Sequence, residues 1–118
     1  MPAGLTLPDG LVGLPALTGF SLETVDDGPL VDLISTDDPG FRFTVVAADD
    51  VRPDLRPALM ERSLATAGDT ILVLLSVHGE PPSLTANLAG PIVASADGVG
   101  RQVVIEDPAF PVRASLAG

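Results

Sequence analysis

The chain has 118 residues, with sixteen Asp or Glu, six Arg and no Lys, and its formal net charge at pH 7 is −10. This length suits one compact domain with a single core that buries roughly two-thirds of the unfolded surface. The negative field repels phosphate backbones and attracts basic partners, so direct nucleic-acid binding is disfavoured. The chain has no Cys, which excludes disulfides and thiolate metal sites, and no Trp or Tyr for stacking on bases.

The N-terminus has neither a basic region nor a continuous apolar stretch, and the longest apolar run is Ile71–Leu75. A membrane span needs about 20 apolar residues. We therefore expect neither a standard export signal nor a membrane span, and a cytoplasmic location fits the sequence.

The first half of the chain alternates between strand patterns and turn residues. Gly19–Val25 predicts a strand that ends at the turn set Asp26–Pro29. Leu30–Thr36 and Phe41–Ala47 predict two strands, and the Asp-Asp-Pro-Gly turn Asp37–Gly40 joins them. Together they predict an antiparallel hairpin.

The only place where a helix competes with strands lies between Asp49 and Gly68. Pro53 and Pro57 argue against an early helix, whereas Ala58–Ala65 contains good helix formers. We predict one short helix there, of about two to three turns, with Gly68 able to end it.

The second half begins with the most apolar segment, Asp69–Val77, which predicts a central strand buried on both faces. Short strands follow, separated by an exposed loop, a Gly-Pro bend and a glycine turn. The predicted loop is 79–83, the strands are Leu84–Asn87, Ile92–Ser95 and Arg101–Glu106, the bend is Gly90-Pro91 and the turn is Asp97–Gly100. The fold class is mostly β: a small antiparallel β-barrel or sandwich-like single domain, residues 1–118, with one short helix. We expect 1–7 and 114–118 to be flexible.

The residue types that could carry chemistry do not assemble into a catalytic or metal-binding pattern. His78 is the only histidine, the acidic pairs lack the spacing of a calcium loop, and the serines lack a nucleophile elbow. Gly98–Arg101 could be taken for a phosphate loop, but it lacks the Lys-Ser/Thr and a following helix, so it predicts a hairpin turn. We expect no enzyme, no cofactor and no metal.

The order of several short motifs resembles that of the FliW family of flagellar assembly factors, and the match spans most of the chain. These motifs are G-L-P at Gly13–Pro15, S-T-D-D-P at Ser35–Pro39 followed by Phe41 and Phe43, T-A-N-L-A-G-P-I-V at Thr85–Val93, G-R-Q-V-V-I at Gly100–Ile105, and P-V-R at Pro111–Arg113.

The resemblance implies an acidic, barrel-like regulatory protein that is monomeric when free. It implies binding to the RNA-binding translational regulator CsrA, and this binding relieves the repression of flagellin synthesis. It also implies alternative binding to free flagellin, which sequesters the protein and so restores the repression. A net charge of −10 fits such a role, because it steers a basic RNA-binding partner toward the protein without any contact to RNA.

For the partner surface we predict the strand and bend of Asn87, Leu88, Pro91 and Ile92, with Glu106 and Asp107 as an acidic rim. In an alternative interpretation Leu88, Ile92 and Val93 are plain core, and Asn87 caps a turn by bonding to the backbone.

Three departures from the family pattern concern the partner surface more than the fold. The family usually has an additional strand before G-L-P, whereas only twelve residues, two of them proline, precede Gly13, so one edge of the barrel is expected to be missing or remade. Gly90 replaces the usual alanine before Pro91, and Ala114 replaces a common histidine.

The competing hypotheses are a structural or secreted β-module and a small β-barrel that binds an apolar ligand or another protein, unrelated to flagella.

Overall fold

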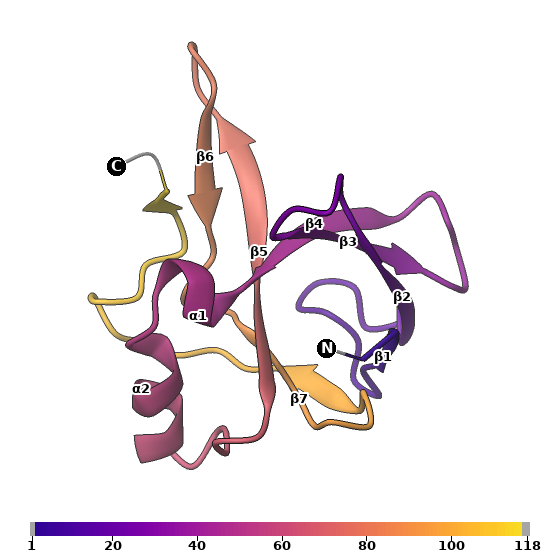
Figure 1. Cartoon of the computed structure of the whole chain (residues 1–118), viewed down its shortest axis with the longest axis horizontal. Helices are drawn as coiled ribbons and strands as arrows, with labels where there is room; N and C mark the ends of the chain where they lie inside the picture. The colour runs from indigo at the N-terminus through magenta and orange to yellow at the C-terminus, as the bar shows by residue number, and fades with distance from the viewer. Residues whose placement is uncertain (1, 117–118) are drawn as a thin grey trace.

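Nine strands and two short helices follow one another along residues 2–116, the part of the chain that the computed structural model describes (Figure 1). They are β1 (Gly4–Thr6), β2 (Gly19–Thr24), β3 (Leu30–Ser35), β4 (Arg42–Ala47), α1 (Ala48–Val51), α2 (Leu55–Glu61), β5 (Thr70–His78), β6 (Ser83–Ala86), β7 (Ile92–Ala94), β8 (Gly100–Gln102) and β9 (Ala114–Ser115).

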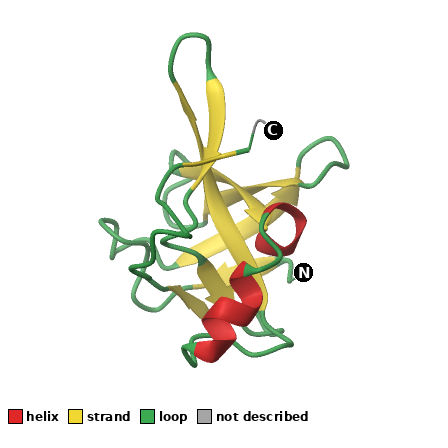
Figure 2. Ribbon diagram, turned by 90° about the vertical axis from the view of Figure 1, so that its left-hand side faces the viewer, coloured by secondary structure: helices red, strands yellow, loops and turns green. Residues whose placement is uncertain are grey.

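The strands form one sheet that curls into a nearly closed antiparallel barrel (Figure 2). Strands β1 to β5 pair in sequence order, and β5 then pairs with β7 along its first half and with β6 along its second half. The β7–β8 hairpin returns toward β1, where the Thr6 N–H donates to the Gly98 carbonyl oxygen at 2.7 Å. The predicted mostly-β barrel is confirmed.

The middle strands have apolar residues on both faces because they separate two cores. Leu72 points into a cluster inside the barrel, whereas Ile71 and Val73 join a second cluster that includes residues of α1 and α2. Val45 and Val46 of β4 divide between the two clusters in the same way. The period of two along a strand therefore places apolar side chains in both cores.

The prediction for β5 holds for its first half and is wrong for its second half. Ile71, Leu72 and Val73 are buried, as expected for a central strand, but Val77 is 66% exposed. The last four residues of β5 extend beyond the barrel and pair only with β6, so this part is a projecting two-stranded hairpin (Figure 1).

The single helix predicted at Ala58–Ala65 is also wrong in number and position. One helical turn, α1, directly follows β4, and α2 starts at Leu55 and ends at Glu61. Pro57 is the third residue of α2, where a backbone N–H has no intrahelical acceptor, so the proline costs no hydrogen bond. Ser63, with φ at +58°, ends the helix well before Gly68.

Paired strands occupy part of each of the two terminal segments that the sequence predicted to be flexible. β1 pairs with β2, and Leu5 and Leu7 are buried, so a strand does precede the G-L-P segment. At the other end, β9 pairs with β6 and the Leu116 N–H donates to the Leu84 carbonyl oxygen. The prediction for residues 1 and 117–118 lies outside the described residues.

The acidic pairs of the first two hairpins have the turn roles that their sequence predicted. Asp26 and Asp27 both adopt positive φ, at +49° and +56°, a conformation that Asp tolerates better than most residues. The Asp38 carboxylate accepts the Gly40 N–H at 3.1 Å, and the Phe41 N–H donates to the Asp38 carbonyl oxygen.

Three arginines attach the helical segment to the rest of the fold. The Arg56 guanidinium pairs with Asp49 at 2.8 Å and donates to the Asp69 carbonyl oxygen at 2.8 Å. Arg62 pairs with Asp107 at 2.7 Å. Arg52 donates to the Ala109 carbonyl oxygen and lies 5.0 Å from the centre of the Phe110 ring, a cation–π distance.

The Asp49–Arg56 ion pair should make the stability of the fold depend on pH. The hydrogen bond from Arg56 lowers the pKa of Asp49 below its usual value of 3.8, so the ionised carboxylate stabilises the folded state above that pH. The contribution disappears as the pH falls through the lowered pKa. We expect Asp49→Asn to reduce the free energy of unfolding by up to about 1 kcal/mol at neutral pH, because the Asp49 side chain is half exposed. Urea unfolding should show this difference shrinking below about pH 4.

Asp50→Asn is the matched control, since it removes the same charge from a residue that has no ion pair among those described. A difference between wild type and Asp49→Asn that stayed constant from neutral pH to about pH 2.5 would contradict the role given to the pair.

Gly100 supplies a second stability prediction, because the barrel leaves no room for a side chain there. A Cβ at this position would overlap the Val93 carbonyl oxygen and lie 2.7 Å from the Ala94 Cα, both backbone atoms of the neighbouring strand. We expect Gly100→Ala to lower the free energy of unfolding by about 2–4 kcal/mol, measured by urea unfolding. Gly68→Ala, where a Cβ meets nothing within 4 Å, should stay within about 0.5 kcal/mol of wild type. Equal stability of the two variants would contradict the packing described here.

Candidate functional site

Three strongly exposed valines from distant parts of the sequence surround one surface hollow. Val12, Val104 and Val112 are 66%, 64% and 61% exposed, and the hollow between them has a volume of about 190 Å³. Exposed apolar side chains that gather in this way usually mark an interaction surface. We call this site the valine groove; its residues are Val12, Asn87, Ala89, Gly90, Gln102, Val104 and Val112.

The loop between β1 and β2 presents Val12 at its tip. Leu11 and Leu14 exchange backbone hydrogen bonds of 3.2 and 2.8 Å, and Gly13 turns the chain with φ at +82°. Leu11 is buried in the barrel core and anchors the loop. The tip residue Val12 therefore stays in contact with solvent.

The side chain of Gln102 holds two walls of the groove together. Its Oε1 accepts the Val12 N–H at 2.8 Å, and its Nε2 donates to the Gly90 carbonyl oxygen at 2.8 Å. One amide thus fixes the loop before β2 relative to the bend before β7, although the two segments are far apart in sequence.

The bend before β7 forms the floor of the groove and explains one departure from the family pattern. The Asn87 Oδ1 accepts the Gly90 N–H at 3.0 Å, which closes the turn. A Cβ on Gly90 would lie only 3.0 Å from the side-chain nitrogens of both Asn87 and Gln102. Glycine lets the two amides approach the bend closely, whereas an alanine would push them apart.

Val104 is exposed because the chain after β8 remains extended with alternating side chains. Val103 and Ile105 are buried, and their N–H groups donate to the carbonyl oxygens of Pro91 and Ala89. Pro91 has no N–H to return such a bond, so the pairing is one-sided and β8 itself ends at Gln102. The predicted strand Arg101–Glu106 is thus partly right: its second half is extended without forming a regular ladder.

A second hollow of about 310 Å³ adjoins the valine groove and shares Asn87 and Val112 with it. We call it the adjoining hollow. Its other residues are Phe43, Leu74, Leu75, Ser76, His78 and Arg113. The two hollows together form a largely apolar surface, and Arg113 is the one arginine in their lining.

The structure places three of the predicted partner-contact residues in the interior. Leu88 and Ile92 are fully buried in the two cores, and Pro91 is fully buried as well. These three side chains are buried, so they do not form the accessible surface on which the sequence analysis placed them. The alternative interpretation, in which Leu88, Ile92 and Val93 are core and Asn87 caps a turn, describes what the structure contains.

The other three predicted residues remain accessible, in different settings. Asn87 lines both hollows. Glu106 is exposed, whereas Asp107 is half-buried and already engaged, because it pairs with Arg62 and accepts the Ala109 N–H at 2.9 Å. The acidic rim is thus reduced to Glu106 as a free carboxylate.

Sequence reasoning missed Val12, Gln102, Val104, Val112 and Arg113. In the Q-V-V-I run, alternation indicates that Val103 and Val104 face opposite sides, but not which side faces the solvent. Val112 and Arg113 belong to the P-V-R motif, which predicted no particular contact.

The chemically suggestive residues form no catalytic arrangement among the described residues. Ser83 donates to the backbone carbonyl oxygen of His78 at 3.2 Å, so this pair is a contact with the main chain. Gly98 has φ at +86° within the β7–β8 turn, as the hairpin prediction required. Residues 2–116 contain no cluster of three potential metal ligands and no helix long and apolar enough to cross a membrane.

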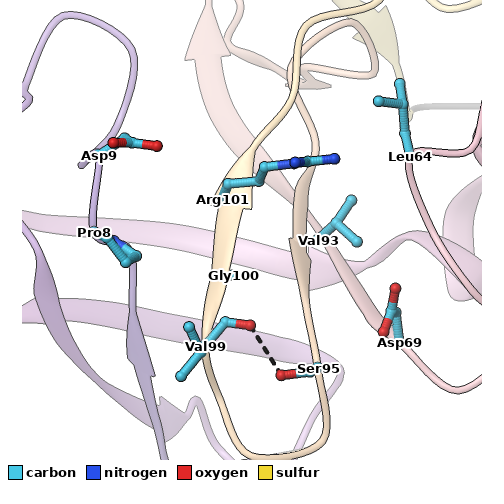
Figure 3. A pocket seen from close by; sticks show the side chains of 9 residues that line it. All are labelled: Pro8, Asp9, Leu64, Asp69, Val93, Ser95, Val99, Gly100 and Arg101. Carbon is cyan, nitrogen blue, oxygen red and sulfur yellow. Dashed lines mark hydrogen bonds between the residues drawn. The ribbon is translucent and has the colours of Figure 1, made fainter.

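A third hollow, of about 360 Å³, lies over the β7–β8 hairpin (Figure 3). Pro8 and Asp9 border it on one side, Leu64 and Asp69 on the other. Its lining carries charges of both signs and is more polar than that of the valine groove. The valine groove therefore provides the better surface for an apolar contact.

The fold and the groove define a small β-barrel with an exposed apolar surface, and comparison with known proteins identifies its family. A family model described as "FliW protein" matches residues 2–116. This chain belongs to the FliW family.

Several proteins named as flagellar assembly factors are similar to it. The chain is 28% identical to "Flagellar assembly factor FliW" of Leptospira biflexa, over 95% of this chain and 79% of that protein. It is 37% identical to "Flagellar assembly factor FliW 2" of Desulfotalea psychrophila, over 78% and 66% of the two chains. The match to the Symbiobacterium thermophilum FliW is 32%, over 92% and 86%. A crystal structure of a flagellar assembly factor FliW superimposes with a TM-score of 0.77 at 21% identity, over 97% of this chain and 85% of that one, and shows the same fold.

The family-like motifs of the sequence converge on the groove. Val12 directly precedes the G-L-P motif, and the other residues of the valine groove come from the T-A-N-L-A-G-P-I-V, G-R-Q-V-V-I and P-V-R segments. Motifs that are separate in the sequence thus build one surface.

The two hydrogen bonds through which Gln102 links the walls of the groove should contribute to the stability of the fold. Gln102→Leu keeps the size but leaves the Val12 N–H and the Gly90 carbonyl oxygen without their partner, so we expect a loss of about 1–2 kcal/mol in the free energy of unfolding. Gln102→Glu keeps the acceptor for Val12 and should lose less. Urea unfolding of both variants tests this, and a Gln102→Leu variant as stable as wild type would contradict the bridge.

Proposed function

We propose that this protein is a regulatory binding protein of flagellar assembly. The observation that carries the proposal is the exposed valine groove in a chain of the FliW family. The similar proteins are named flagellar assembly factors, which supports the same process for this one. A protein that acts by binding needs an exposed apolar surface with defined edges, and the groove has both properties.

The partners that we propose are CsrA, an RNA-binding translational regulator, and flagellin. Binding to CsrA relieves the repression of flagellin synthesis, and binding to flagellin withdraws the protein from CsrA. The net charge of −10 supports this choice, because it accelerates the encounter with a basic RNA-binding protein and disfavours contact with the RNA itself. In this proposal the protein acts in the cytoplasm, as a monomer when free, and without catalysis.

We place the contact surface at the accessible members of the predicted set. Asn87 lies in the groove, and Glu106 is the exposed carboxylate two residues after Val104. The buried residues Leu88, Pro91 and Ile92 support this surface from behind by fixing the strand and bend on which it is built.

The small-ligand alternative receives no support from the barrel interior. Its core is packed with side chains from β1 to β5 and from β7, and the hollows described above lie at the surface. We therefore propose protein binding as the function.

Isothermal titration of the purified protein with CsrA and, separately, with flagellin from the same organism tests the proposal. We expect binding to both, with an affinity for CsrA that weakens several-fold between about 50 mM and about 500 mM salt, because screening removes the electrostatic attraction. Absence of binding to both proteins would overturn the proposed function while leaving the fold and family unchanged.

A further inference from the structure

The lining of the valine groove and the adjoining hollow contains none of the acidic residues that dominate the rest of the protein, and the exposed Glu106 lies outside this lining. The chain has sixteen carboxylates and a net charge of −10, yet no Asp or Glu lines the valine groove or the adjoining hollow. With His78 counted as neutral, the only formal charge among the lining residues is the guanidinium of Arg113. The formal charge of the lining residues is therefore opposite in sign to the net charge of the protein.

Arg113 is also available for an intermolecular contact. Arg52, Arg56 and Arg62 each have a carboxylate partner at 2.7–3.0 Å, whereas Arg113 has none among the described residues and is exposed. A guanidinium at the edge of an apolar surface binds a carboxylate through two parallel hydrogen bonds, and it does so more selectively than a Lys ammonium.

The remaining polar group of the surface suits the main chain of a bound segment. The Asn87 Oδ1 is occupied by the Gly90 N–H, so the side-chain nitrogen is the part of this amide that can donate to an incoming carbonyl oxygen. Asn87 and Val112 line both hollows, and Arg113 lines the adjoining one. The surface therefore combines apolar contacts, a hydrogen-bond donor and a cation.

We propose that the valine groove and the adjoining hollow form one docking surface for an apolar segment of a partner protein that carries a carboxylate opposite Arg113. The inference rests on the proposed protein-binding function and adds the chemistry of the segment that is bound. Apolar side chains of the segment contact Val12, Val104 and Val112, and its Asp, Glu or terminal carboxylate pairs with Arg113. The general negative field brings a partner close, whereas this local surface selects an acidic-apolar segment of it.

The first experiment compares matched variants in titrations with CsrA and with flagellin. Val104→Asp introduces a charge into the groove and should lower the affinity for at least one partner by about 30-fold or more. Arg113→Gln should lower the affinity for the same partner by about 5- to 10-fold. Val77→Asp and Arg101→Gln are the controls, because Val77 is equally exposed but lines neither hollow, and Arg101 is an exposed arginine outside both. Both control variants should bind the partner with an affinity within about 2-fold of that of wild type.

The outcomes separate the two proposals. If wild type binds a partner and the groove variants bind like the controls, the docking surface is wrong and the proposed function stands. If Arg113→Gln binds as tightly as wild type while Val104→Asp does not, the proposed pairing of a partner carboxylate with Arg113 is wrong. A self-association that Val104→Asp abolishes, seen by analytical ultracentrifugation, would assign the surface to a second copy of this chain and overturn the proposal.

A second measurement decides the docking surface even if wild type binds neither protein. The probes are the peptides acetyl-Leu-Val-Leu-Ala-Glu-amide and its Gln counterpart, titrated into ¹⁵N-labelled protein. We expect the Glu peptide to shift the amide signals of Val12, Val104 and Val112 at lower concentration than the Gln peptide, and we expect Arg113→Gln to remove the difference. No groove signal shifting with either peptide, or equal affinity of the two for wild type, would overturn the proposal.

Discussion

The burial of apolar side chains on both faces of β4, β5 and β7 is the constraint on which the rest of the structure depends. Neighbouring residues of these strands point alternately into the barrel core and into the second core that the helices help to form. The same short strands bound both cores, so a substitution that disturbs their pairing affects both. The helices are too short to be stable alone, so their arginine contacts and their packing against this sheet determine where they lie.

The groove follows from the way the chain leaves these buried strands. Beyond β8 the alternation continues, so Val103 and Ile105 remain in the core while Val104 faces the solvent. The loop carrying Val12 is held against this segment by Gln102, whose amide accepts the Val12 N–H and donates to the Gly90 carbonyl oxygen. The exposed apolar surface is therefore built on rigid, buried supports, which favours binding because little conformational entropy is lost when a partner docks.

The sequence predicted most of the fold because its strong signals are local. Turn residues such as Asp26–Pro29 and Asp37–Gly40 and the alternation around them determined the first hairpins. The helix was misplaced because Pro57 is harmless in a first helical turn, and the exposure of Val77 depends on β5 running past the barrel. Of the residues predicted for partner contact, Asn87 lines the groove, whereas Leu88, Pro91 and Ile92 lie in the core. Which of Val103 and Val104 faces the solvent depends on the segments that pack against them, and these segments are distant in the sequence.

Hydrogen–deuterium exchange of the protein, free and in complex with flagellin or CsrA, shows whether a partner binds at the valine groove. We expect slower exchange on binding in the loop around Val12, in 102–105 and in 111–113, with no change in the turns at 26–29 and 37–40. Protection confined to those two turns, or to the projecting β5–β6 hairpin, would contradict it.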